Sequence, residues 1–173
     1  GPVGSGKTTQ AKLLAGYLGI PLIGMGEVLR ELAQKNNSQG RNLREEINKG
    51  GLVDDVLVAK IARERITEDD CKNGFVFDGD PRSLSQVELF DPGYDKVFYL
   101  DISDEVAKQR LLERGRGDDT PEVIEERLKV YHQEPELILE YFEDKRILQK
   151  INGEREVDQI QQQIRSYLKR GKK

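Results

Sequence analysis

The sequence is short of cysteine, of long apolar runs and of positive charge, and each shortage excludes a class of protein. Its single cysteine, Cys71, excludes a disulfide framework and a zinc site built from four cysteines, and it fits a reducing compartment. No apolar run approaches the roughly 18 residues of a membrane-spanning helix. The net charge of −4 argues against a general surface for nucleic acid or another polyanion. We therefore expect a cytoplasmic protein that binds neither nucleic acid nor a membrane.

What the sequence does have is a glycine-rich start. Residues 1–9 read GPVGSGKTT and fit the phosphate-binding loop pattern G-x-x-x-x-G-K-[ST]. Backbone N–H groups of such a loop, with a helix N-terminus behind them, hold the closely spaced charges of a polyphosphate. Gly4 and Gly6 allow the required backbone angles. We expect Lys7 to reach the β- and γ-phosphates and the Thr8 hydroxyl to bind Mg²⁺.

The length and the pattern of apolar residues predict one α/β domain. The 173 residues suit a single domain. Apolar runs predict strands at 20–23, 75–77, 96–102 and 147–151. Helical periodicity predicts helices at 7–18, 27–34, 43–49, 55–66, after Ser103, from Pro121 onward and at 157–168. Residues 36–40 are predicted to form a polar loop. This alternation predicts the P-loop NTPase fold, a doubly wound parallel sheet flanked by helices. Because a phosphate loop normally follows a buried central strand, we expect five strands, the first formed by roughly five to eight apolar residues before Gly1.

Arginines fall where the loops gather at the strand ends. They are Arg30, Arg82, Arg114, Arg116 and Arg127. A guanidinium group binds phosphate bidentately and stays charged. Asp78 ends a predicted strand, as expected of a carboxylate that orients Mg²⁺ through water. The pattern predicts transfer of a phosphoryl group, which needs two aligned phosphates, neutralised charge and exclusion of water.

Taken in order, the motifs resemble those of the nucleoside monophosphate kinases, and most closely the adenylate kinase family in its short-lid form. KTTQ at 7–10 is similar to the family's G-K-G-T-Q, and DGDPR at 78–82 is similar to D-G-F-P-R. Gln86 stands where the family places the glutamine that reads adenine. KGGLV at 49–53 resembles K-G-x-L-V, and RGRGDD at 114–119 resembles R-G-R-x-D-D. The resemblance covers essentially the whole chain.

The resemblance implies Mg²⁺-dependent transfer of the γ-phosphoryl group of ATP to AMP, giving two ADP. It implies a monomer, a mobile arm over residues 24–53 that binds the monophosphate, and a very short lid at 113–120. The catalytic residues would be Lys7, Arg82, Arg114, Arg116 and Arg127. ATP would be bound by Gly4, Ser5, Gly6, Lys7, Thr8, Thr9, Arg114 and Arg155, and Mg²⁺ by Thr8 and Asp78, partly through water. AMP would be bound by Met25, Arg30, Gly51, Leu52, Val53, Gly79, Asp80, Pro81, Arg82, Gln86, Arg116 and Arg127.

Two departures from the family's pattern leave alternatives open. Met25 stands where the family has a threonine at the monophosphate base, and Asp80 replaces the phenylalanine of D-G-F-P-R. A carboxylate next to Arg82 is expected either to weaken monophosphate binding or to pair with an arginine when the site is empty. Gln86 favours AMP, because its amide both donates and accepts across an adenine edge. The alternatives are a UMP/CMP kinase and an inactive nucleotide-binding module of a larger protein, which would bind ATP without forming ADP.

Overall fold

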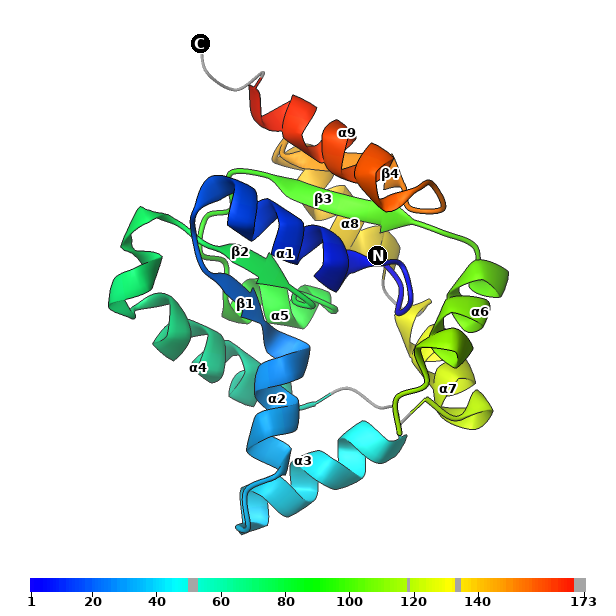
Figure 1. The fold of residues 1–173 in the computed structure, drawn as a ribbon. Coiled ribbons are helices and arrows are strands. Elements are labelled where there is room, and N and C mark those ends of the chain that lie inside the picture. Colours follow the sequence, from blue (N-terminus) through cyan, green and yellow to red (C-terminus); the bar gives the residue numbers. More distant parts are fainter. Residues whose placement is uncertain (50–52, 118, 133–134, 170–173) are drawn as a thin grey trace.

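The fold is built from parallel strands joined by helices (Figure 1). The computed structural model describes residues 1–49, 53–117, 119–132 and 135–169. Strand β1 (Leu22–Gly24) pairs with β2 (Val76–Asp78), and β3 (Val97–Asp101) pairs with β4 (Leu148–Asn152). Both pairs are parallel, with Ile23 opposite Phe77 in the first and Tyr99 opposite Lys150 in the second. The parallel α/β arrangement predicted from the sequence is therefore confirmed.

The helices follow the predicted order. They are α1 (Lys7–Leu18), α2 (Met25–Ala33), α3 (Ser38–Lys49), α4 (Asp55–Ile66), α5 (Leu84–Leu89), α6 (Asp104–Arg114), α7 (Pro121–Tyr131), α8 (Pro135–Asp144) and α9 (Val157–Lys169), with a 3₁₀ turn at Asp69–Asn73. Side chains cap them as expected: Asp54 accepts from the N–H of Leu57, and Thr120 accepts from that of Val123. Over the ranges described, none of these helices combines the length and the apolar content that crossing a membrane requires.

One local prediction was wrong, and one short helix was not predicted. The polar loop expected at 36–40 is in part helical, because the Asn37 side chain accepts from the N–H of Gly40 at 2.7 Å and α3 begins at Ser38. The short helix α5 was not predicted, since six residues carry little periodic signal; Ser83 caps it by accepting from the N–H of Gln86. Figure 1 shows α2 and α3 extending away from the strands, where the monophosphate-binding arm was predicted.

In the part of the chain that the structure describes, three apolar clusters hold these elements together. The first packs α4 against the β1–β2 pair, with Ala62 fully buried beside Ile23. The second packs α1 and α9 on the β3–β4 pair through Leu14, Leu100, Ile151, Ile160 and Ile164. The third joins α6 to α7 through Ala107, Leu111, Ile124 and Leu128.

A cavity of about 730 Å³ separates the two strand pairs. Its lining includes Val76 and Phe77 of β2, Phe98 and Leu100 of β3, and Leu14 and Ile164 from the helices. Among the described residues β2 and β3 are not paired with each other, and residues of both strands line this cavity. The five-stranded sheet therefore stays a prediction, and the cavity is where its central strand would fit.

The cavity gives that prediction a direct test. A chain extended before Gly1 by about six apolar residues should unfold at a higher urea concentration than the chain of 173 residues. Each apolar side chain fully buried contributes about 1.5–3 kcal/mol, so a net gain of about 2 kcal/mol is expected after the cost of ordering the strand. An extension in which alternate residues are aspartate is the control. Equal stability of the two extended chains would contradict the prediction.

Candidate active site

The glycine-rich loop has the backbone geometry that its sequence predicts. Gly4 and Gly6 have φ angles of +80° and +87°, in the left-handed region that favours glycine. A Cβ at Gly4 would also lie 2.8 Å from the carbonyl oxygen of Ala107, so the loop packs directly on α6. Helix α1 begins at Lys7 with neither a side-chain cap nor an acidic residue in its first turn. The positive end of this helix is thus open to an anion.

Lys7 turns back onto the loop that precedes it. Its Nζ donates to the carbonyl oxygens of Gly1 at 2.7 Å and Pro2 at 2.6 Å. Burial lowers the pKa of Lys7 to about 8, and the nearby charges of Arg82 and Arg114 add to this effect. The fold thus holds the lysine among positive groups, and a bound anion would relieve this repulsion.

Thr8 and Asp78 place a hydroxyl and a carboxylate side by side next to the glycine-rich loop. The Thr8 hydroxyl donates to Oδ2 of Asp78 at 2.6 Å, across 70 positions of sequence. Asp78 is the last residue of β2, so the strand end places its carboxylate beside the start of α1. Hydroxyl and carboxylate oxygens suit Mg²⁺, which keeps several waters and also takes phosphate oxygens. Among the residues described, no group of three or more His, Cys, Asp or Glu side chains offers an all-protein metal site.

One cavity of about 550 Å³ brings the predicted phosphate-binding groups together. Its lining includes Lys7, Thr8 and Asp78 together with Arg30, Arg82, Arg114, Arg116 and Arg127. A Cβ placed at Gly26 would lie 3.5 Å from Nη1 of Arg30 and 4.0 Å from Nη2 of Arg82, so both guanidinium groups border the start of α2. The Nε of Arg82 donates to the carbonyl oxygen of Gly79 at 2.7 Å. The sequence prediction that these arginines converge is therefore confirmed, although their roles stay predictions.

A buried carboxylate links two of the arginines. Asp119 Oδ1 accepts from Arg114 Nη2 at 2.7 Å and from Arg127 Nη1 at 2.9 Å, and Oδ2 accepts from Arg114 Nε at 2.8 Å. The Asp119 side chain has no exposed surface. Because Arg114 ends α6 and Arg127 lies on α7, this residue fixes the two helices and their charges relative to each other.

The predicted monophosphate side of the cavity contains Met25, Val53, Gly79, Asp80 and Gln86. Met25 is 1% exposed. Burial raises the pKa of Asp80 to about 6; Arg82 opposes this shift and Asp55 adds to it. Burial lowers the pKa of Arg82, although Asp80 opposes that shift too. Asp80 therefore lies close enough to act on Arg82, as the sequence predicted. The predicted contacts of Gly51 and Leu52 fall outside the described residues.

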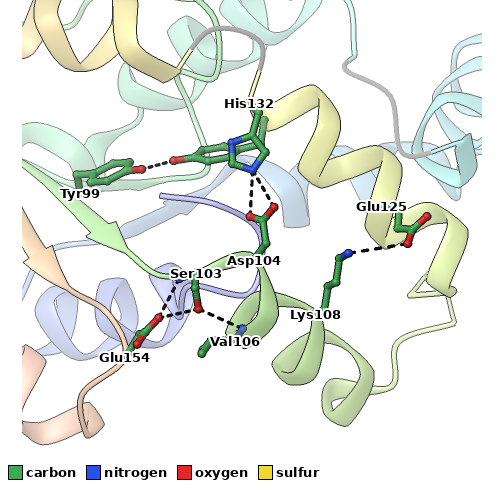
Figure 2. Close-up of polar contacts among 9 residues, drawn as sticks. Tyr99, Ser103, Asp104, Val106, Lys108, Glu125, His132 and Glu154 are labelled. Carbon is green, nitrogen blue, oxygen red and sulfur yellow. Dashed lines mark hydrogen bonds and ion pairs between the residues drawn. The ribbon is translucent and has the colours of Figure 1, made fainter.

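The structure adds one basic residue and leaves one out. Arg110 lines the cavity and donates from Nη1 to the carbonyl oxygen of Gly153 at 2.9 Å. Its spacing of four residues from Arg114 on one helix was the signal that sequence reasoning missed. Arg155 does not line the cavity. Its loop is held beside α6, where Glu154 Oε1 accepts from the backbone N–H and the hydroxyl of Ser103 at 2.9 Å each (Figure 2).

The fold has parallel strands and a glycine-rich loop before α1. Its cavity brings together a lysine, the oxygens of Thr8 and Asp78, and several arginines. These features define a phosphotransferase of the P-loop NTPase fold. Comparison with known proteins identifies the family. The model of the adenylate kinase family matches residues 1–147. The chain belongs to the adenylate kinase family.

Curated relatives match nearly the whole chain. Adenylate kinase 1 of Nostoc sp. is 35% identical over 175 residues, which cover 97% of this chain and 95% of the relative. The adenylate kinase of Bifidobacterium longum is 37% identical over 179 residues, with 97% and 96% covered. That of Prochlorococcus marinus (strain AS9601) is 38% identical over 175 residues, with 97% and 95% covered. The resemblance drawn from the motifs is therefore confirmed.

Proposed function

We propose that this protein transfers the γ-phosphoryl group of ATP reversibly to AMP, with Mg²⁺, giving two ADP. The observation that carries the proposal is the convergence of the phosphate loop, the Thr8–Asp78 pair and the five arginines on one cavity that also contains Gln86. Membership of the adenylate kinase family supports it. The chemistry asks the protein to align two nucleotides and to neutralise the charge of the transferring group.

The loop end of the cavity is the proposed ATP site. The N–H groups of residues 4–9 and the ammonium of Lys7 would hold the β- and γ-phosphates, and Arg114 would add charge at the γ-phosphate. Thr8 and Asp78 would hold Mg²⁺, which neutralises charge on the phosphates when bound. Arg110 would border the nucleotide beside the loop at 153–155.

The opposite end is the proposed AMP site. Arg30 and Arg82, which border the same turn of α2, would hold the AMP phosphate, and Arg116 and Arg127 would contact the group in transit. Closure of the arm over residues 24–53 and of the lid at 113–120 would keep water from accepting the phosphoryl group.

A coupled assay of ADP formation tests the proposal. With ATP and Mg²⁺, kcat/KM for AMP should exceed that for UMP or CMP by at least about tenfold. Fast turnover of UMP or CMP with little use of AMP would identify the pyrimidine alternative. Binding of ATP without ADP formation from any monophosphate would identify the inactive module.

Asp80→Phe should tighten AMP binding. Above its pKa of about 6 Asp80 is negative and competes with the AMP phosphate for Arg82. Removing the negative charge of Asp80 from beside Arg82 should make AMP binding more favourable by about 1 kcal/mol. KM for AMP should therefore fall about fivefold while kcat changes little. Asp80→Asn is the matched control, since it removes the charge and keeps the size. An unchanged or higher KM in both variants would contradict this reading of Asp80.

A further inference from the structure

Gln86 is held by two hydrogen bonds of opposite kind. It lies on α5, is 3% exposed and borders the cavity at its monophosphate end. Its Oε1 accepts from the backbone N–H of Arg82 at 2.5 Å, and its Nε2 donates to Oδ1 of Asp55 at 2.8 Å. The amide therefore keeps one N–H and one oxygen lone pair for a ligand.

These two partners allow only one orientation of the amide. A backbone N–H only donates and a carboxylate only accepts. Turning the amide over would place its NH₂ against the N–H of Arg82 and its oxygen against Asp55, and both contacts would be repulsive. The orientation of Gln86 is thus set by chemistry that cannot be reversed while Asp55 is a carboxylate.

Asp55 is itself held in place. Its Oδ2 accepts from the hydroxyl of Ser83 at 3.0 Å, and the same hydroxyl oxygen accepts from the N–H of Gln86 at 3.1 Å. Asp55 is the first residue of α4, while the capping of that helix is done by Asp54. The carboxylate of Asp55 is therefore free of the capping role and is directed to α5 instead.

We propose that Asp55 is a positioning residue that determines base specificity: it locks the Gln86 amide so that the site accepts a base with an exocyclic amino group and rejects its oxo counterpart. This rests on the proposed function. Adenine presents a donor amino group beside an acceptor ring nitrogen, which matches the remaining oxygen and N–H of Gln86. Hypoxanthine presents an acceptor oxygen beside a donor ring N–H and would need the amide turned over. AMP and IMP differ only in this pair of groups, so they isolate the effect.

The test is Asp55→Asn, whose side chain both donates and accepts and so removes one of the two contacts that fix the orientation of Gln86; the contact with the N–H of Arg82 remains. The AMP-to-IMP ratio of kcat/KM should fall about tenfold, mainly through a gain for IMP. Asp54→Asn is the matched control, because it removes the same charge from the start of α4 and asparagine still caps; its ratio should equal that of the wild type. Asp55→Glu, whose carboxylate only accepts hydrogen bonds, should keep most of the wild-type AMP-to-IMP ratio. Asp55→Ser repeats the test with a smaller side chain that also donates and accepts.

The outcomes separate the two proposals. If the wild-type protein uses AMP and all four variants keep its AMP-to-IMP ratio, the proposed function stands and the role of Asp55 is overturned. An equal fall in both kcat/KM values for Asp55→Asn would likewise overturn it, since it indicates a merely structural role. If the wild-type protein forms no ADP from AMP, the proposed function itself fails.

Discussion

Lys7→Ala should lower kcat at least about a hundredfold while the protein stays folded. Lys7 is held at the phosphate loop by the carbonyl oxygens of Gly1 and Pro2, inside the cavity that contains the five arginines. A charge aimed at the transferring group is worth most in the transition state, where removing a single such donor costs about 10²–10³ in kcat.

The stability of this variant should change little. The pKa of Lys7 is lowered from 10.5 to about 8 by burial and by Arg82 and Arg114. A lysine whose pKa falls on folding carries a charge that the folded state disfavours, so removing that charge offsets the loss of its two hydrogen bonds. Circular dichroism and urea unfolding would check this.

Lys60→Ala is the control for the loss of a lysine. Lys60 lies on α4, its side chain is 71% exposed, and its ion pair with Glu64 spans 4.0 Å. Its kcat should stay within about twofold of the wild type, as for most exposed positions remote from a site. A kcat for Lys7→Ala within about threefold of the wild type would exclude the proposed role of this lysine.

Asp119→Ala should reduce both stability and turnover. Its fully buried carboxylate accepts hydrogen bonds from Arg114 on α6 and Arg127 on α7. Removing one partner of a buried ion pair typically costs about 3–5 kcal/mol; because the Arg114 side chain is 34% exposed, we expect about 2–3 kcal/mol here. The two guanidinium groups would then lose the carboxylate that fixes them relative to each other, and kcat should fall about a hundredfold.

An exposed ion pair provides the control. Lys150 and Glu143 approach to 2.6 Å, yet their side chains are 55% and 48% exposed. Glu143→Ala should cost less than about 1 kcal/mol, as exposed pairs do, and should leave kcat unchanged. If Asp119→Ala loses no more stability than Glu143→Ala and keeps its kcat, then Asp119 does not organise the two arginines.

Several features were predictable because short stretches of sequence specify them. The positive φ angles of Gly4 and Gly6 were predictable from the local sequence pattern, because few residues other than glycine adopt such angles. Ser103 and Thr120 cap the helices that follow them, as their positions indicated. Lys7, Asp78 and the arginines were found because strand ends and helix starts are readable from periodicity, and parallel strands bring such ends to one edge. The order of the motifs then indicated the adenylate kinase family.

Other features depend on residues far apart in the sequence. The sequence predicted a loop where α3 begins, because residues 36–40 are polar. In the structure the Asn37 side chain caps the helix at this point. The bridge from Asp119 to Arg127 and the contact of Arg110 with Gly153 require α6 to lie beside α7 and β4. The lock of Asp55 on Gln86 joins residues 31 positions apart.

The sequence by itself determined the phosphate loop, the alternation of strands and helices, and which charged residues would lie near the strand ends. It did so because backbone angles, caps and apolar periodicity act over a few residues. The tertiary structure decided which carboxylate fixes which cation or amide, because a hydrogen bond requires two groups within about 3 Å, and only packing of the helices on the strands brings such groups together.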